Sequence, residues 1–368
     1  MSSAPASSTV PVHLDVNSRA GRYAVEIAPG LSAALATLLD AAGAPARRII
    51  VSNPTVWRLH GSAFGGVTAD EPILIPDGER FKTLQTTGRI YDALLRLETA
   101  RSTALVALGG GVVGDTAGFA AATFLRGIPL VQVPTTLLAQ VDSAIGGKVG
   151  VNHAAGKNLI GAFHPPAIVA VDPQLLVTLP RREFRAGLYE VIKYGMIASR
   201  PLFDRVGSTL RALFARDPAA LMPVIAESCA IKAAVVEEDE RERGPRRALN
   251  FGHTAGHALE AVTKYRRFRH GEAVAYGMLA AAAVAVARGA MRDEDRRTLT
   301  ALITQMGPLP AIADLSSAAV IEATRRDKKI VDGQLHFVLA TAIGRTEIVT
   351  DVSEAELARA LREIGLRA

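Results

Sequence analysis

Five short apolar runs rich in β-branched residues alternate with helical patterns in the first half of the chain, and this alternation limits the folds available to it. The runs end in turn residues and cover 47–53, 72–78, 103–111, 129–136 and 167–173. Strands that alternate with helices are typical of a parallel sheet covered by helices. The sequence therefore predicts an α/β domain over residues 1–175.

Strand patterns nearly vanish after Pro180. Apolar residues then recur at spacings of three and four, which indicates amphipathic helices, in the stretches 181–198, 218–240, 253–265 and 271–289. One strand-like run appears late, at 334–341. We expect a mostly α-helical second domain over residues 176–368, and a cleft between two domains is the default place for a ligand.

Composition narrows the classes of function. The chain has 368 residues, 49% of them hydrophobic, with a net charge of +6 and one cysteine, Cys229. The basic residues are scattered without interleaved aromatics, so the sequence favours a small anionic substrate over nucleic acid. The alanine-rich stretch 278–291 is too short to cross a bilayer, and we expect a buried helix there and no membrane contact. A lone cysteine excludes an internal disulfide and fits a reducing compartment.

A glycine turn follows the third strand-like run. Gly109, Gly111 and Gly114 satisfy the G-x-G-x-x-G pattern, in which the backbone approaches a pyrophosphate at a helix N-terminus. The acidic residue usual about 20 positions later is missing, which argues against an ordinary dinucleotide fold. A tight turn in any α/β protein, with Asp115 as a helix cap, is the alternative.

A second glycine-rich stretch, residues 140–166, holds Asp142, Lys148, Asn152, Lys157 and Asn158. Glycine-rich backbone with two lysines suits phosphate binding. A solvated surface loop is the alternative, although it would rarely hold so many apolar residues.

Two histidines four apart, His253 and His257, would share one face of a helix. They can be two metal ligands, one ligand and one catalyst, or ordinary surface residues. Glu190 on an earlier helix and His270 at a later helix start complete a plausible zinc site. Thr254 occupies the position at which zinc proteases carry a glutamate, so a metalloprotease is not expected.

Seven stretches together resemble the 3-dehydroquinate synthase family and follow its order along the chain. They are DGERFK (77–82), GGGVVGDTAGFAAATFLRG (109–127), QVPTTLLAQVDSAIGGKVGVNHAAGKNLIGAFHPP (132–166), GLYEVIKYG (187–195), EEDERERGPRRALNFGHTAGHALE (237–260), HGEAVAYGM (270–278) and RRDKK (325–329). The chain departs from the family pattern at Val149, where threonine is expected, and at Tyr189, where a small residue is commoner.

The resemblance implies an N-terminal NAD domain, a helical C-terminal domain with zinc or cobalt, and a cytoplasmic homodimer. It implies conversion of 3-deoxy-D-arabino-heptulosonate 7-phosphate, a sugar-acid phosphate, to 3-dehydroquinate and phosphate in the second step of the shikimate pathway, with transient NAD reduction. It also assigns the metal to Glu190, His253 and His270, whereas His257 faces the substrate phosphate. Zinc and cobalt are not distinguished by the sequence.

The other roles that the resemblance implies fall into three groups. The catalytic residues are Asp142, Lys148, Lys193, Glu242 and His257. The substrate-binding residues are Arg126, Asn158, Lys232, Arg246 and Asn250, with Lys328 or Lys329, between which the sequence does not choose. The cofactor-binding residues are Asn53, Asp77, Glu79, Lys82, Gly111, Val112, Val113, Gly114, Asp115, Thr135, Thr136, Lys148, Lys157, Leu175 and Thr178.

Two other activities share much of this pattern. Other sugar-phosphate cyclases, such as 2-deoxy-scyllo-inosose synthase, use the metal and NAD but act on substrates without a carboxylate. Lys232, Arg246 and Asn250 form the set that would read a carboxylate, and they favour dehydroquinate synthase. A metal-dependent alcohol or glycerol-phosphate dehydrogenase is the second alternative, and it would produce net NADH.

Overall fold

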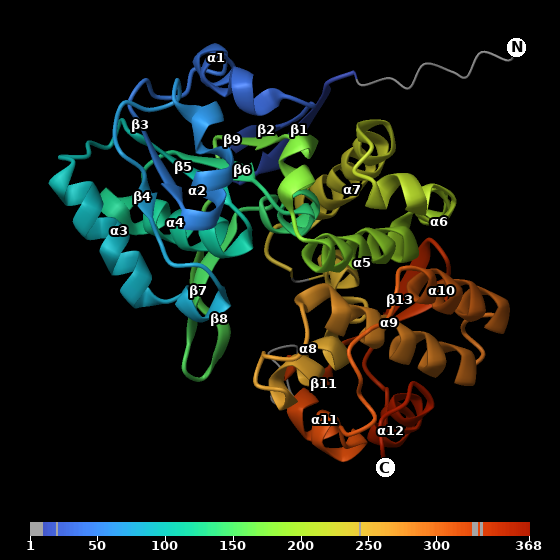
Figure 1. Ribbon diagram of the computed structural model, residues 1–368. Helices are drawn as coiled ribbons and strands as arrows, with labels where there is room; N and C mark the ends of the chain where they lie inside the picture. The colour runs from blue at the N-terminus through green and yellow to red at the C-terminus, as the bar shows by residue number, and fades with distance from the viewer. Residues whose placement is uncertain (1–9, 20, 243, 326–329, 332–333) are drawn as a thin grey trace, which may run out of the picture. The chain divides into compact units, whose positions relative to one another are not determined.

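The structure is a computed structural model that describes residues 10–19, 21–242, 244–325, 330–331 and 334–368 (Figure 1). The chain divides into two compact units. The first comprises Met1–Pro180 with Ala212–Glu240, and the second comprises Arg181–Arg211 with Arg241–Ala368.

A seven-stranded sheet organises the described part of the first unit, in the order β1-β2-β9-β6-β5-β3-β4. Every neighbouring pair is parallel except β1 and β2, which form an antiparallel edge. The strands are β1 (Val12–Ser18), β2 (Gly21–Ile27), β3 (Arg48–Ser52), β4 (Ile73–Leu74), β5 (Ala104–Gly109), β6 (Leu130–Pro134) and β9 (Ile168–Val171).

Helices cover both faces of this sheet, as Figure 1 shows. Alternate residues of β5 enter two different cores: Leu105 joins the cluster with α3 and α4, whereas Val106 joins the cluster with α1. This alternation follows from the two-residue period of a strand and explains why the central strands are apolar throughout. The helices of the unit are α1 (Leu35–Ala41), α2 (Pro54–His60), α3 (Leu84–Arg96), α4 (Gly111–Thr123) and α7 (Pro218–Glu238).

Caps and turns fix where several helices begin. The Asn53 side chain accepts from Val56 N at 2.7 Å and starts α2, and Pro54 follows at the first helical position. Asp217 caps α7 in the same way, through Ala219 N at 2.9 Å. An antiparallel hairpin, β7 (Lys148–His153) with β8 (Gly156–Phe163), packs against α4.

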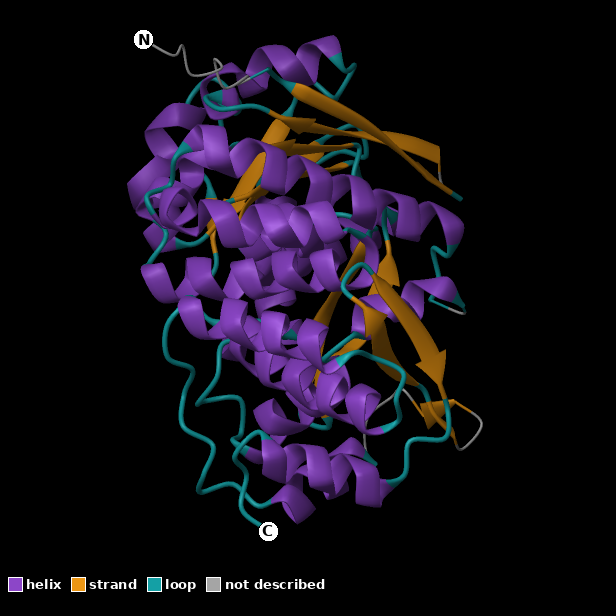
Figure 2. Ribbon diagram, turned by 90° about the vertical axis from the view of Figure 1, so that its right-hand side faces the viewer, coloured by secondary structure: helices purple, strands orange, loops and turns teal. Residues whose placement is uncertain are grey.

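The second unit is mainly helical, and α9 lies at its centre. This helix packs against α5, α8, α10, α12 and the strand β12; Figure 2 distinguishes these helices from the few strands by colour. Its elements are α5 (Arg181–Ala198), α6 (Arg200–Phe214, whose last residues belong to the first unit), α8 (His253–Val262), α9 (His270–Ala287), α10 (Asp293–Gln305), α11 (Ser317–Thr324), β10 (Ile330–Val331), β11 (Gln334–Leu335), β12 (Phe337–Ala342), β13 (Arg345–Val349) and α12 (Glu354–Glu363).

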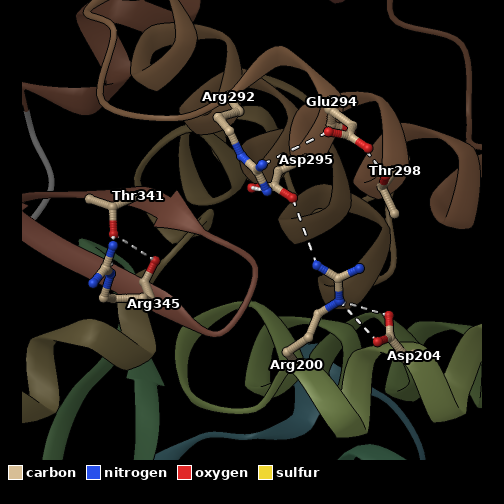
Figure 3. Close-up of polar contacts among 8 residues, drawn as sticks. All are labelled: Arg200, Asp204, Arg292, Glu294, Asp295, Thr298, Thr341 and Arg345. Carbon is tan, nitrogen blue, oxygen red and sulfur yellow. Dashed lines mark hydrogen bonds and ion pairs between the residues drawn. The ribbon is translucent and has the colours of Figure 1, made fainter.

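Charged pairs join helices at the edge of this unit. Arg200 at the start of α6 lies 2.9 Å from Asp204 on its own helix and 3.8 Å from Asp295 on α10 (Figure 3). Arg292 lies 3.5 Å from the same Asp295. Asp295 is buried, and a buried carboxylate is costly unless it is paired. The two arginines provide that pairing.

The predicted α/β and helical fold class is confirmed, and the five predicted strands appear as β3, β4, β5, β6 and β9. The stretch 212–240, placed by sequence in the second domain, clusters with the first unit instead. The reason is that α7 packs against β1 and β2. Among the described residues, α7 and α9 are apolar and long enough to cross a membrane, but 56% and 72% of their apolar windows are buried, as in core helices.

Candidate metal and cofactor sites

Three histidines of the second unit gather their ring nitrogens within 4.8 Å of one another: His253 and His257 on α8 and His270 at the start of α9. Their ring centroids are 5.1–5.7 Å apart. Glu190 on α5 faces two of them, with its Oε1 at 3.8 Å from His253 Nε2 and 3.5 Å from His270 Nε2. Three helices thus converge on one set of metal-type donors.

Glycines explain why these helices approach so closely. A Cβ on Gly277 of α9 would lie 1.7 Å from the carbonyl oxygen of Gly252, the N-cap of α8. A Cβ on Gly271 would lie 1.9 Å from the carbonyl oxygen of Ala186 on α5. Both contacts are with backbone, so only glycine allows α9 to bring His270 this close to the other two helices.

The outer ring nitrogens of two histidines already have partners. His253 Nδ1 lies 3.2 Å from the Phe251 carbonyl oxygen, and His270 Nδ1 lies 3.2 Å from Glu260 Oε2. A carbonyl or carboxylate oxygen can only accept, so each Nδ1 carries the hydrogen. Each Nε2 faces Glu190 and is the nitrogen that could bind a metal placed between them, with the hydrogen on Nδ1 as a metal ligand needs.

Glu190 is fully buried, and neither of its oxygens accepts a hydrogen bond of good geometry. The ammonium of Lys193, one turn later on α5, lies 2.5 Å from Oε2 as an ion pair. A buried carboxylate with so few hydrogen bonds is costly unless a cation completes its surroundings. The residues present therefore fit a divalent metal held by Glu190 with two or three histidines.

Other predicted site residues of the second unit lie in and around the 3-10 turn Pro245–Asn250 before α8. Arg246 is 1% exposed, a fully buried guanidinium. Asn250 donates through Nδ2 to Glu242 Oε1 at 2.5 Å, and Glu242 has a positive φ of 58°. Lys328 and Lys329 lie outside the described residues.

In the first unit, the glycine turn joins β5 to α4 as predicted. Gly111 begins the helix, and Val112, Val113 and Asp115 follow in its first turns. A Cβ on Gly114 would lie 2.8 Å from Gln132 Oε1, so this glycine allows α4 to lie close to β6. The N-terminus of α4 presents backbone N–H groups, an arrangement that suits an anion such as pyrophosphate.

A buried ammonium connects three segments beside this turn. Lys82 Nζ pairs with Asp115 on α4 and donates to Asn158 Oδ1 at 2.6 Å on β8. Burial raises the pKa of the Asp115 carboxyl, and the Lys82 ammonium opposes that shift. Asn152 on β7 donates to Glu79 Oε1 at 2.8 Å and accepts from Asn158 N at 2.9 Å. The sequence assigned these residues separately, whereas the structure joins them in one network.

The remaining predicted cofactor residues occupy the loops that follow the strands. Thr135 is buried, and the Thr136 hydroxyl accepts from Ala139 N at 3.2 Å. Asp77 accepts from the Thr55 hydroxyl at 2.5 Å. The other predicted positions are the cap residue Asn53, the partly exposed Lys157 at the hairpin tip, the buried Leu175, and Thr178, whose hydroxyl is 2.8 Å from His60 Nε2.

Four more predicted residues carry charge on the first unit. Asp142 lies in the π-helical turn Ala139–Ser143 and accepts from Lys232 of α7 at 2.5 Å. Lys148 is exposed at the start of β7. Arg126 follows α4 with a positive φ of 68°, next to Leu125, which also has a positive φ.

Glu260 is a residue that sequence reasoning left without a role, and it contacts the predicted metal ligand His270. Glu260 lies three residues after His257 and seven after His253, so helical spacing alone places all three on one face of α8. That spacing was the available signal for Glu260.

Comparisons with known proteins cover almost the whole chain. A family model described as 3-dehydroquinate synthase N-terminal matches residues 72–186, and one described as 3-dehydroquinate synthase C-terminal matches residues 187–330. The 3-dehydroquinate synthase of Synechococcus sp. is 46% identical over 97% of this chain and 98% of its own length. That of Gloeobacter violaceus is 48% identical over 96% and 98%.

Solved structures of related cyclases share the fold. A 2-epi-5-epi-valiolone synthase from Streptomyces hygroscopicus with NAD+ and Zn2+ bound has a TM-score of 0.86 at 29% identity and covers 93% of this chain and 96% of that one. A 2-deoxy-scyllo-inosose synthase complexed with carbaglucose-6-phosphate, NAD+ and Co2+ has a TM-score of 0.86 at 26% identity, covering 96% and 100%.

Proposed function

The chain belongs to the 3-dehydroquinate synthase family, and we propose that it converts 3-deoxy-D-arabino-heptulosonate 7-phosphate to 3-dehydroquinate and phosphate. The observation that carries this proposal is the convergence of Glu190, His253, His257 and His270 in a chain whose near full-length relatives bear that name. The enzyme is then a carbon–oxygen lyase of the shikimate pathway.

We propose that Glu190, His253 and His270 hold one zinc or cobalt ion. The orientation of both Nε2 atoms toward Glu190 supports this set over the set of three histidines. A metal held there would supply polarisation of the substrate's C5 oxygen, and NAD held by the first unit would supply a reversible hydride acceptor. His257, on the same face of α8, then faces the substrate phosphate as hydrogen-bond donor.

The charged residues divide the substrate between them in this proposal. Lys193 holds the Glu190 carboxylate by its ion pair and donates to a substrate hydroxyl. Asp142 binds a second hydroxyl, and Glu242 orients a water near C5. Arginine guanidinium and lysine ammonium groups suit the substrate's carboxylate and phosphate. The carboxylate is assigned to Arg246, Lys232 and Asn250 with Lys328 or Lys329, and the phosphate to Arg126, Lys148, Asn158 and His257.

NAD is assigned to the first unit. The α4 N-terminus receives its pyrophosphate through the backbone of Gly111, Val112, Val113 and Gly114. Lys82 and Asp115 form a paired charge beside it. The other assigned cofactor residues are Asn53, Asp77, Glu79, Thr135, Thr136, Lys148, Lys157, Leu175 and Thr178.

One observation supports the alternative function, a cyclase of another sugar phosphate. The solved structures named above are cyclases that act on other substrates. Their identity to this chain is 29% and 26%, against 46% and 48% for the two dehydroquinate synthases. The buried Arg246 guanidinium also favours a substrate that carries a carboxylate. We therefore assign the acid substrate.

We further propose that the enzyme is a cytoplasmic homodimer. The single cysteine supports a reducing compartment. Leu125 and Arg126 support the dimer, because Leu125 is 38% exposed and both residues hold strained backbone at the surface. Arg126 would reach the phosphate of the neighbouring subunit.

The test is a phosphate-release assay with the heptulosonate phosphate, NAD and zinc, with the product identified by mass. Phosphate should accumulate while absorbance from NADH stays flat, because NAD is regenerated in each turnover. NADH that rises in step with phosphate would refute the cyclase function and indicate a dehydrogenase.

A variant then tests the choice of substrate. Arg246→Ala should weaken binding of the acid substrate by about 1.5–3 kcal/mol, the usual contribution of a hydrogen bond to a charged group. Its affinity for NAD should remain that of the wild type. Equal losses of both affinities would contradict the assignment of Arg246 to the carboxylate.

A further inference from the structure

We propose that Glu260 is a positioning residue of the metal centre, which fixes the ring orientation and tautomer of His270 and so raises metal affinity. The inference rests on the proposed metal set, to which it adds a residue outside the ligands. Glu260 lies on α8 and His270 on α9, so the contact also joins the two helices that supply histidines.

The geometry distinguishes the two nitrogens of His270. Its Nδ1 lies 3.2 Å from Glu260 Oε2, and its Nε2 lies 3.5 Å from Glu190 Oε1. The ring therefore sits between two carboxylates, each facing one nitrogen. Because Glu260 occupies the Nδ1 side, only Nε2 is available as a metal ligand, and the hydrogen resides on Nδ1.

Glu260 is more buried than the His270 ring that it contacts. Its side chain is 3% exposed, whereas that of His270 is 28% exposed. A buried carboxylate has little freedom to change rotamer, so the more exposed ring is held by the less mobile group. A carboxylate on the outer nitrogen also makes the imidazole a stronger ligand, and loss of such partners typically costs about 10–100-fold in metal affinity.

The two histidines proposed as metal ligands, His253 and His270, have different partners on Nδ1. His253 Nδ1 faces the Phe251 carbonyl oxygen, which belongs to the backbone beside the start of its own helix. His270 instead depends on a side chain from another helix. A substitution of Glu260 can therefore remove the Nδ1 partner of His270 and leave the Nδ1 partner of His253 in place, which makes the proposal testable.

The experiment measures zinc affinity of the metal-free full chain by competition with a chromogenic chelator. Glu260→Leu removes the acceptor at similar volume, and its affinity should fall about 10–100-fold. Glu260→Gln keeps an acceptor oxygen for Nδ1–H but loses the charge, so it should restore part of the affinity. The absorption spectrum of the cobalt-substituted protein should change in Glu260→Leu and resemble the wild type in Glu260→Gln.

Asp295→Leu is the matched control, because it also removes a carboxylate that is 3% exposed in the second unit. Its partners are Arg200 and Arg292 rather than a histidine, as Figure 3 shows. This variant should unfold at lower temperature without a change in zinc affinity. An equal loss of affinity in Asp295→Leu would mean that general destabilisation explains the effect, and the proposal would be overturned.

Glu190→Gln separates this inference from the proposed metal set. If Glu190→Gln loses zinc and folded Glu260→Leu binds it within twofold of the wild type, the positioning role is wrong and the metal set stands. If Glu190→Gln also keeps its zinc affinity, the metal set itself is wrong and this inference falls with it.

Discussion

Gly277→Ala should damage the metal centre without touching any of its ligands. The new Cβ would lie 1.7 Å from the carbonyl oxygen of Gly252, 2.7 Å from its carbonyl carbon and 3.0 Å from Gly256 N. All three atoms are backbone, so no side-chain rotation relieves the contact. Gly252 directly precedes His253, so the clash acts on α8 at the position of a predicted ligand.

The size of the effect follows from that distance. To restore a 3.0 Å contact from 1.7 Å, the carbonyl oxygen must retreat by about 1.3 Å, whereas metal–ligand distances tolerate about 0.2 Å. Overpacking costs typically about 1–3 kcal/mol, and we expect about 3 here because backbone must move. A loss of about 3 kcal/mol lowers the melting temperature of a unit of this size by roughly 6–12 °C. Zinc affinity should fall at least tenfold.

Gly207→Ala is the matched control. Gly207 lies in α6, in the same unit, and its nearest atom to a new Cβ is Leu302 Cδ1 at 3.7 Å, an ordinary contact. Alanine in a helix is favoured over glycine by about 0.5–1 kcal/mol, so this variant should be neutral or more stable. The measurements are thermal unfolding of the metal-free chain and chelator competition for zinc. A Gly277→Ala variant that matches Gly207→Ala in both would refute the close-packing argument.

Three further predictions use other parts of the chain. Burial raises the pKa of the Cys229 thiol to about 12, so the native protein should not react with a thiol reagent at pH 8, and urea should expose one reactive thiol. Arg288 lowers the pKa of Glu356 to about 2. The stabilisation from this carboxylate is present above pH 4.5 and lost as the pH falls toward 2, so the difference in unfolding midpoint between Glu356→Gln and the wild type should vanish over that interval. Inactive Arg126→Ala and His257→Ala chains should regain activity when mixed and allowed to exchange subunits, and no recovery despite demonstrated exchange would place Arg126 in the site of its own subunit.

Strong periodic patterns predicted most of the fold. The stretch 181–198 predicted α5 with its observed bounds, and the five apolar runs predicted the parallel strands. The pattern did not indicate β1 and β2 or the hairpin of β7 and β8. In the hairpin, Leu159 and Phe163 are exposed and glycines interrupt both strands, so the alternation of buried and exposed residues is weak.

The helical spacing of His253 and His257 could not by itself identify the ligands of the metal. Spacing puts both rings on one face of α8, and the structure indeed brings them within 5.3 Å between centroids. What distinguishes them is contact with other elements. His253 Nε2 faces Glu190 Oε1 of α5 at 3.8 Å, the same carboxylate oxygen that faces His270 Nε2 at 3.5 Å. Such a contact depends on how α5 packs, which one helix's sequence does not contain.

Positive backbone φ is the other feature that the sequence did not predict, and it occurs at predicted substrate-binding and catalytic residues. Arg126, Asn158 and Glu242 are three of the eight described non-glycine residues with positive φ. Such a conformation costs of order 1–3 kcal/mol for most residues and persists only where surrounding contacts hold it. Asn158 accepts from Lys82, and Glu242 accepts from Asn250, so hydrogen bonds at each of these two positions offset part of the cost. Local sequence preference opposes positive φ at Arg126 and Glu242, whereas asparagine adopts it more readily. The contacts that maintain Asn158 and Glu242 join residues 76 and 8 positions apart. Local backbone propensity therefore does not predict the conformation at positions where the proposed substrate would require fixed side chains.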